Sequence, residues 1–334
     1  MMWNGKVLGE GGVVTRARTT SVRGAPADGH AAALVHSDEQ LFDEAARYVR
    51  AGIEDKDLVV IGGPPAFQQA MAEDFGDSEG VEFDDGVRLN AKRAPDAIGH
   101  CVQLSGRAAG RGSGRLRILA QVDYSVDARA TREFACFEAA SNLMPAVAPT
   151  SVLCIYDTRR LAPELVDTAA CTHGSIVEAG RVRPSDSFVD PHEFIRSLPV
   201  PAEPLQASLP LLAVDDAASL ADLRHALGDE LTRAVHDRDR REDLHLAISE
   251  MAANAFRHGA RPVGARLWAS ADRLVCTVTD GGRGMDPLRG YWPAHGDDLG
   301  RGGMGLWLAR KLCDHVDLVS DQHGTTVRLA TALR

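Results

Sequence analysis

The chain has 334 residues, of which 44% are hydrophobic, and it carries a net charge of −10. This acidic balance disfavours direct nucleic-acid binding, which needs clustered Lys and Arg, and no apolar run approaches the roughly 20 residues of a membrane-spanning helix. The length suits two domains. The six cysteines include no Cys-x-x-Cys pair, which fits a reducing compartment, and we therefore expect a cytoplasmic protein.

Residues 1–29 are rich in Gly, Thr, Arg and Ala, and we expect them to form a disordered tail. Helical and strand patterns alternate after this tail. Ser37 or Asp38 can cap a helix at 39–51, and Leu58–Gly62 is the continuous apolar run of a buried parallel strand. Further strands are predicted at 116–122 and 152–156, and further helices at 66–75, 95–110, 128–143 and 162–171. This alternation predicts an α/β domain with a mostly parallel sheet and flanking helices.

Polar residues stand at the ends of these predicted strands, as in Gly62-Gly63, Gln121, Asp123, Tyr156 and Asp157. Open α/β sheets bind ligands at this edge, although ordinary strand-end polarity is the simpler interpretation.

Two smaller patterns in the same half have simple interpretations. Glu138 and Asn142 lie one turn apart on the helix predicted at 128–143, and we expect a solvated face or a cap there. Cys171-x-His173 has the spacing of half a metal site, but no second pair accompanies it.

The first half of the chain resembles the MEDS sensory domain. The resemblance rests on the helix entry His36-Ser37-Asp38-Glu39, the strand and turn Leu58–Pro65, the pair Glu138-x-x-x-Asn142 and the run Cys154-Ile155-Tyr156-Asp157-Thr158. It implies a sensory domain over residues 30–178 that detects a small molecule or a partner. Residues 179–208 are rich in proline, and we expect a semi-rigid linker there with one short helix near 192–197.

The second half begins with two predicted helices, at 220–235 and 240–258. In the second helix, apolar residues recur at helical spacing along one face. Glu250, Asn254 and His258 follow one another every four residues, so they form one polar row. A carboxylate and an amide on such a row can serve a hydrated Mg²⁺ ion and the hydroxyl or water that attacks a phosphate.

Glycine-rich turns follow this helix. An alternating strand at 274–279 ends at Asp280, and the glycines after it, Gly282 and Gly284 among them, let a flat base approach the backbone while the carboxylate accepts from an amine. A second glycine-rich segment leads into an amphipathic helix at 306–313, and amides at such a helix start bind anions. Its glycines include Gly302, Gly303 and Gly305, and Thr325 and Thr326 open a last strand.

The order and spacing of these segments resemble the N, G1, G2 and G3 boxes of the GHKL ATPases, which have the α+β Bergerat fold. The resemblance covers residues 209–334 and is greatest to the anti-sigma-factor serine/threonine kinases. It implies that the domain binds ATP and Mg²⁺, with Asn254 as metal ligand, Asp280 on the adenine amine and Glu250 as general base.

The resemblance also implies the remaining nucleotide contacts. Residues 287–299 show no periodicity and are predicted to be a mobile lid, in which Trp292 either stacks on a partner or folds back onto the domain. The other residues expected to hold the nucleotide are His258, Gly282, Gly284, Gly302, Gly303, Gly305, and Thr325 or Thr326.

A kinase of this group would act as an anti-sigma factor. It would phosphorylate a STAS-type anti-anti-sigma protein and control sigma-factor availability in response to a signal at the first domain. His236 is an unsuitable phosphoacceptor, because only 14 residues (250 − 236 = 14) separate it from Glu250 and leave no room for a helical hairpin. Two alternatives stay open: a non-catalytic, nucleotide-gated module that binds a transcription regulator, and a histidine kinase acting in trans. The related kinases make a homodimer a candidate assembly.

Overall fold

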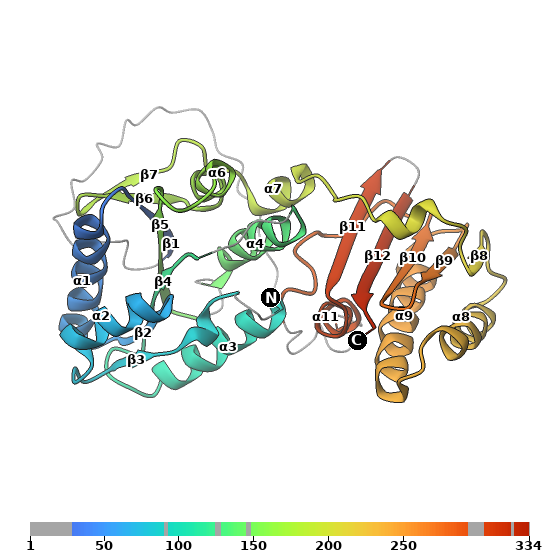
Figure 1. Ribbon diagram of the computed structural model, residues 1–334, viewed down its shortest axis with the longest axis horizontal. Coiled ribbons are helices and arrows are strands. Elements are labelled where there is room, and N and C mark those ends of the chain that lie inside the picture. The colour runs from blue at the N-terminus through green and yellow to red at the C-terminus, as the bar shows by residue number, and fades with distance from the viewer. Residues whose placement is uncertain are drawn as a thin grey trace, which may run out of the picture.

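The computed structural model describes residues 29–89, 93–123, 128–144, 148–292, 304–321 and 324–333. They form a seven-stranded sheet, here sheet A, and a five-stranded sheet, here sheet B, each covered by its own helices (Figure 1). Sheet A is parallel apart from its last strand, and sheet B is antiparallel. The predicted fold class, an α/β domain followed by an α+β domain, is confirmed. The predicted tail lies outside the described residues except for Gly29.

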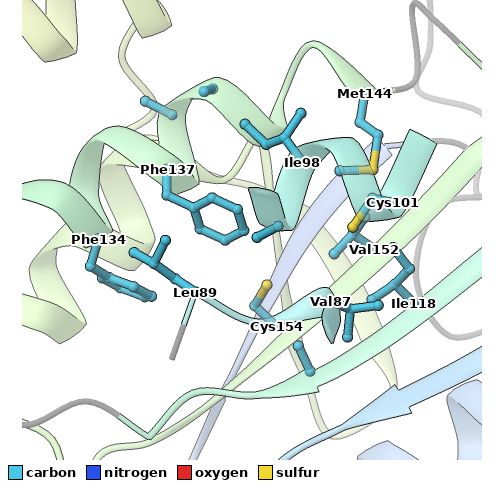
Figure 2. Packing of buried hydrophobic residues seen from close by; sticks show 14 of the residues in the cluster. Val87, Leu89, Ile98, Cys101, Ile118, Phe134, Phe137, Met144, Val152 and Cys154 are labelled. Atoms are coloured by element: carbon cyan, nitrogen blue, oxygen red, sulfur yellow. The ribbon is translucent and has the colours of Figure 1, made fainter. Parts of the chain in front are cut away.

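Sheet A has the strand order β3-β2-β4-β5-β1-β6-β7. Its strands are β1 (Gly29–Val35), β2 (Leu58–Gly62), β3 (Val81–Phe83), β4 (Leu116–Gln121), β5 (Thr150–Asp157), β6 (Ser175–Glu178) and β7 (Arg181–Pro184). The helices are α1 (Asp38–Asp55), α2 (Pro65–Phe75), the 3₁₀ turn η1 (Asp85–Val87), α3 (Ala94–Ala108), α4 (Ala128–Ser141) and α6 (Pro163–Thr172). Side chains of α1 and α2 fill one face of the sheet, and those of α3, α4 and α6 fill the other. Figure 2 shows part of the second cluster, with Phe134 and Phe137 of α4 and Ile98 and Cys101 of α3.

Local sequence signals account for most of these elements. Every residue of β2 and β4 is buried, as expected for central parallel strands. The Ser37 hydroxyl accepts a hydrogen bond from the Gln40 N–H at 3.1 Å and so caps α1 as predicted. β1 was not predicted, because three consecutive alanines have low strand propensity, yet it lies in the sheet between β5 and β6.

Glu138 on α4 corrects one prediction. Instead of lying on a solvated face, its carboxylate is only 2% exposed and faces His30 and His173. Asn142, one turn further, donates to the Thr172 carbonyl at 2.7 Å. Both side chains point into the domain, because α6 and the residues after it cover this face of α4.

The proline-rich stretch contains regular structure. Strand β7 continues sheet A beyond residue 178, and the predicted short helix is present as α7 (Pro191–Ser197), followed by the 3₁₀ turn η2 (Pro204–Ala207). The Asp190 carboxylate caps α7 by accepting hydrogen bonds from the backbone N–H groups of His192 and Glu193. Phe194 and Ile195 are buried in the core of the first domain, so α7 is fixed to it.

Sheet B has the strand order β11-β12-β10-β9-β8. Its strands are β8 (Leu212–Val214), β9 (Gly264–Ala269), β10 (Arg273–Asp280), β11 (His315–Asp321) and β12 (Gly324–Ala332), and its helices are α8 (Leu220–Ala234), α9 (Arg238–His258) and α11 (Met304–Leu312). The helices pack on one face of the sheet around a core of aliphatic side chains. Leu205 of η2 packs on the other face, where Trp268 donates to the Ser208 carbonyl at 3.0 Å.

The two domains share part of a hydrophobic core. Leu288 and Tyr291 belong to the second half of the chain, but they are 4% and 1% exposed within the core cluster of the first domain, and Trp292 packs against it. The Arg310 guanidinium of α11 lies 4.0 Å from the centre of the Tyr291 ring. The start of the predicted lid is therefore held by the other domain, and residues 293–299 lie outside the described part of the chain.

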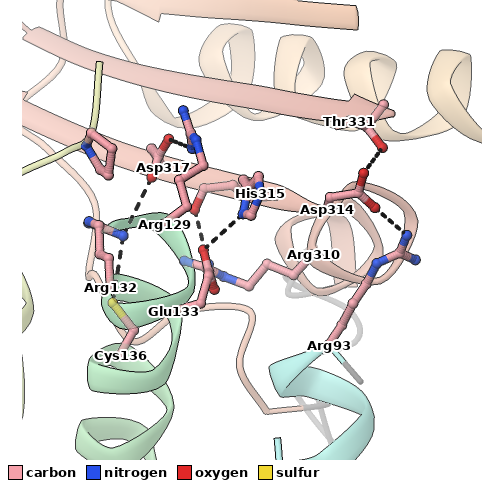
Figure 3. A network of polar contacts seen from close by, with 12 residues as sticks. Arg93, Arg129, Arg132, Glu133, Cys136, Arg310, Asp314, His315, Asp317 and Thr331 are labelled. Carbon is pink, nitrogen blue, oxygen red and sulfur yellow. Dashed lines mark hydrogen bonds and ion pairs between the residues drawn. The ribbon is translucent and has the colours of Figure 1, made fainter. Parts of the chain in front are cut away.

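A buried ionic network joins the domains beside this core (Figure 3). Asp317 of β11 is 2% exposed and lies 3.4 Å from Arg129 and 3.5 Å from Arg132, both on α4. Arg328 of the neighbouring β12 donates to the same carboxylate at 2.7 Å. The carboxylate is thus neutralised from both domains, which removes the cost of burying it alone.

Two further ion pairs connect α3 with α11 and the strand after it. Arg93 donates to the Asp314 carboxylate at 2.9 Å, and Lys311 lies 2.9 Å from the Asp96 carboxylate. The C-terminal end of α11 is thereby tied to the first domain. None of the helices in the described residues is long and apolar enough to cross a membrane.

We predict that Asp317→Asn lowers the free energy of unfolding by about 3 kcal/mol or more, because the arginines around it lose their buried counter-charge. Burial acts to raise the pKa of Asp317, but the hydrogen bond from Arg328 and the positive charges of Arg328, Arg132 and Arg129 together outweigh it, and the pKa is lowered. A folded-state pKa below the unfolded value means that this stabilisation is present at neutral pH and is lost as the pH falls below about 4.

Urea unfolding of both forms, at neutral pH and through the acidic range, measures this effect. Asp215→Asn is the control, because it removes an exposed partner of Arg266 and should leave the unfolding midpoint unchanged. Wild-type stability in Asp317→Asn at neutral pH would contradict the prediction.

Candidate functional site

The polar row on α9 faces the gap between this helix and the end of sheet B. Apolar side chains on the rest of the helix pack into the core with α8 and the sheet, which fixes the rotation of α9. Asn254 is 8% exposed, and His258, one turn later, is exposed. The amide is therefore the most buried member of the row, between the half-buried Glu250 and the exposed His258.

The adjoining ends of β10 and β12 supply the second wall. Asp280, the last residue of β10, is directly opposite Thr325, and Thr279 is opposite Thr326. Because side chains alternate along a strand, Thr325 and Thr326 point to opposite faces of the sheet. Thr325 is buried on the side of α9, so only this one of the two predicted threonines lies beside Asp280.

Two glycines make room for Asp280. A side chain at Gly324 would place its Cβ 1.9 Å from the Asp280 carbonyl oxygen, and the φ of +139° suits only glycine. A Cβ at Gly259, just after α9, would lie 2.4 Å from the Asp280 carboxylate. The carboxylate can therefore lie directly against the end of the helix.

The backbone also orients this carboxylate. The Gly282 N–H donates to Asp280 Oδ1 at 2.7 Å, and the Gly281 N–H donates to the Ala260 carbonyl at 2.7 Å. Burial raises the pKa of Asp280 above its usual value, and the backbone hydrogen bonds counteract part of this rise. The backbone thereby holds the carboxylate in place, and its remaining lone pairs can accept from a ligand.

These residues line a cavity of about 280 Å³, close to the lower end of small-molecule pockets, about 300 Å³. Six predicted residues lie on its wall: Asn254, His258, Asp280, Gly282, Gly284 and Thr325. The sequence analysis missed five others: Gly259, Arg283, Met285, Asp286 and Arg289. Four of these five follow Asp280 in the same segment of sequence, which ends at Arg289, but only the glycines after Asp280 were recognised as a signal.

Glu250 lies beside this cavity rather than on its wall. A Cβ built at Gly305 would be 2.9 Å from Glu250 Oε2 and 3.2 Å from Asn254 Nδ2. The first turn of α11 thus lies directly against the polar row of α9. Gly302 and Gly303 lie outside the described residues, so their role stays a prediction.

This arrangement combines three kinds of recognition. A partly buried carboxylate can accept from an exocyclic amine, and glycines beside it admit a flat ring. Side-chain oxygens of Asn254 and Glu250 are ligands that Mg²⁺ prefers, usually together with water. The N-terminal end of α11, which packs on both, offers backbone N–H groups to an anion.

Comparisons with known proteins agree with the two-domain organisation. The family model described as a histidine kinase-like ATPase domain matches residues 213–331. The model of MEDS, the MEthanogen/methylotroph, DcmR Sensory domain, matches residues 29–174. Both predicted resemblances are confirmed.

Individual relatives match the second domain. The serine-protein kinase RsbW of Bacillus subtilis (strain 168) is 33% identical over 123 residues, which are 33% of this chain and 76% of the relative. The serine-protein kinase RsbW of Bacillus velezensis is 32% identical over 146 residues, 40% of this chain and 82% of the relative. The crystal structure of the RsbU and RsbW domains of Rv1364c from Mycobacterium tuberculosis covers 37% of this chain and 32% of that chain, with 23% identity and a TM-score of 0.27.

We predict that Gly324→Ala destabilises the second domain by about 2 kcal/mol or more, because the new Cβ meets the Asp280 carbonyl and the backbone is strained. Urea unfolding measures the loss. Gly106→Ala is the matched control: a Cβ there meets nothing within 4 Å on the exposed side of α3, and alanine in a helix should stabilise by up to about 1 kcal/mol. Equal stability of the two variants would show that a Cβ at position 324 does not clash with the Asp280 carbonyl oxygen.

Proposed function

Because the chain belongs to the family of the serine-protein kinase RsbW, we propose that it is an ATP- and Mg²⁺-dependent serine/threonine kinase acting as an anti-sigma factor. One observation carries the proposal: Asn254, Asp280 and Thr325 come from three elements and line one cavity. The proposed substrate is a serine or threonine of a STAS-type anti-anti-sigma protein. When it is not engaged with this partner, the kinase would sequester a sigma factor.

The base of the nucleotide would enter beside β10. Asp280 would accept from the exocyclic amine of adenine, while Gly282 and Gly284 would leave the ring space next to the backbone. The Thr325 hydroxyl lies across the strand pair from Asp280, so it would bind the same edge of the base directly or through water. His258 at the mouth of the cavity would lie near the sugar and phosphates.

The polar row would serve the reaction itself. Asn254 would ligate Mg²⁺, which neutralises charge on the phosphates when it is bound. Glu250 would accept the proton of the attacking hydroxyl, and its contact with the first turn of α11 holds it near the place where backbone amides would bind phosphate. Gly302, Gly303 and Gly305 are the proposed source of those amides.

The first domain would regulate this site through its two contacts with the second. Tyr291, at the start of the lid, is buried in the first domain's core, and α11 is paired with α3 through Lys311 and Asp96. Lid and α11 are the elements that border the proposed phosphate site. A signal that shifts α3 or α4 would therefore change the closure of the lid or the position of Gly305.

We expect Glu250→Gln to bind ATP with wild-type affinity but to transfer phosphate at least about 100-fold more slowly, because the amide cannot accept the proton. The assay is label transfer from radioactive ATP to each STAS protein of the host, with retention of label after acid treatment. Glu242→Gln, on the exposed face of the same helix, is the control.

Three outcomes separate the alternatives. Label on a STAS serine or threonine supports the proposal. Bound ATP without any transfer by the wild type supports a nucleotide-gated binding module instead. Acid-labile label on a partner would identify a histidine kinase acting in trans.

The nucleotide pocket has its own test. We expect Asp280→Asn to weaken ATP binding about 10- to 100-fold, since a hydrogen bond to a charged group contributes about 1.5–3 kcal/mol. Isothermal titration with ATP-Mg²⁺ measures this, and Asp229→Asn on exposed α8 serves as control. Unchanged affinity in Asp280→Asn would place the base elsewhere.

A further inference from the structure

A second polar cluster lies inside the first domain, away from the nucleotide cavity. His30 is on β1, Glu138 on α4, Cys154 on β5 and His173 directly after α6. All four residues are at least 95% buried. One nitrogen, oxygen or sulfur atom from each lies within 4.8 Å of the other three.

The separations of these atoms fit a shared cation. His30 Nε2 and His173 Nε2 are each 3.2 Å from Glu138 Oε2, and His30 Nε2 is 3.4 Å from Cys154 Sγ. A tetrahedral zinc ion with bonds of about 2.0–2.3 Å holds its ligand atoms roughly 3.3–3.7 Å apart. Three of the six separations therefore already lie close to those around such an ion, and the other three are at most 4.8 Å.

Hydrogen bonding fixes the tautomer of His173. Its Nδ1 lies 2.9 Å from the Ala169 carbonyl, which can only accept, so Nδ1 carries the proton. The neighbouring Thr172 hydroxyl donates its own proton to the Thr168 carbonyl and also accepts from His173 Nδ1. In the neutral ring, Nε2 then carries no proton, and its lone pair faces the lone pairs of Glu138 Oε2. Neither atom can donate to the other, whereas a cation between them would bind both.

The charges in the cluster also match a divalent ion. Neither Glu138 Oε2 nor His173 Nε2 has a hydrogen-bond partner among the described residues, although both atoms are buried. A buried carboxylate and, after loss of its proton, the Cys154 thiolate would balance a charge of two.

We propose that His30, Glu138, Cys154 and His173 form a binding site for a divalent transition-metal ion of the zinc type. Two imidazoles, one thiolate and one carboxylate are a mixed nitrogen, sulfur and oxygen set that zinc accepts in tetrahedral geometry. Three of the four ligands also line a cavity of about 40 Å³ beside α4, which leaves room next to the cluster. Its other walls are mainly apolar, with Phe134, Phe137 and Val152 among the side chains visible in Figure 2.

This site differs from the one that the sequence suggested. Cys171 and His173 have the spacing of half a metal site, but Cys171 is not part of the cluster. The thiol comes instead from Cys154, in the middle of a buried strand. The two cysteines therefore provide a matched pair for the experiment.

The test uses the full chain, stripped with a chelator and then titrated with Zn²⁺ or Co²⁺. We expect one ion per chain, a higher unfolding temperature when the ion is bound, and a thiolate-to-cobalt charge-transfer band. Cys154→Ser should remove that band and Cys171→Ser should keep it. Glu138→Gln should weaken binding about tenfold or more, since even partners that only orient metal ligands contribute 10- to 100-fold.

Several results would overturn the proposal. Wild-type chain that binds no stoichiometric ion would show that a proton, shared by Glu138 and His173, holds the cluster together. If only Cys171→Ser loses the charge-transfer band, the metal ligand is Cys171 and not Cys154, and the proposed site is wrong. Circular dichroism of each variant excludes unfolding as the cause, and ATP affinity, measured separately, shows that the nucleotide domain is unaffected.

Discussion

The buried carboxylate of Asp317 is the interaction on which the arrangement of the two domains depends. A charge that is 2% exposed is costly unless cations surround it, and two of the arginines near it come from α4 of the other domain. Separation of the domains would expose this acid, the arginines and the ring of Tyr291 together. The same contacts hold the start of the predicted lid and α11, so the joint between the domains adjoins the cavity of the candidate site.

The sequence predicted best the features that depend on local spacing. The row of Glu250, Asn254 and His258 follows from the helical period, and the place of Asp280 follows from an alternating strand that ends in glycines. The choice between Thr325 and Thr326 required the register of β10 and β12, because adjacent strand residues point to opposite faces. The sequence alone shows that Thr325 and Thr326 point to opposite faces of the sheet, but it does not show which of them faces α9.

The features that were missed depend on contacts between distant segments. β1 is a strand because β5 and β6 pair with its backbone on both sides, although its alanines alone do not favour one. Tyr291 belongs to a segment without periodicity, and only the packing of the domains shows that it is a core residue. Glu138 was expected in solvent because its buried neighbours, His30 and His173, approach it from other elements.

Helix α4 connects two very different environments. Arg129 and Arg132 in its first turns neutralise an acid of the second domain, and Glu138, about 9 Å further along the axis from Arg132, faces the histidines. A helix this short moves as a rigid unit, so a shift of the Glu138 end would also displace Arg129 and Arg132 at the other end. A change of chemistry at the Glu138 end could therefore alter the signal that the first domain detects, while the arginine end keeps the same contact with the second domain.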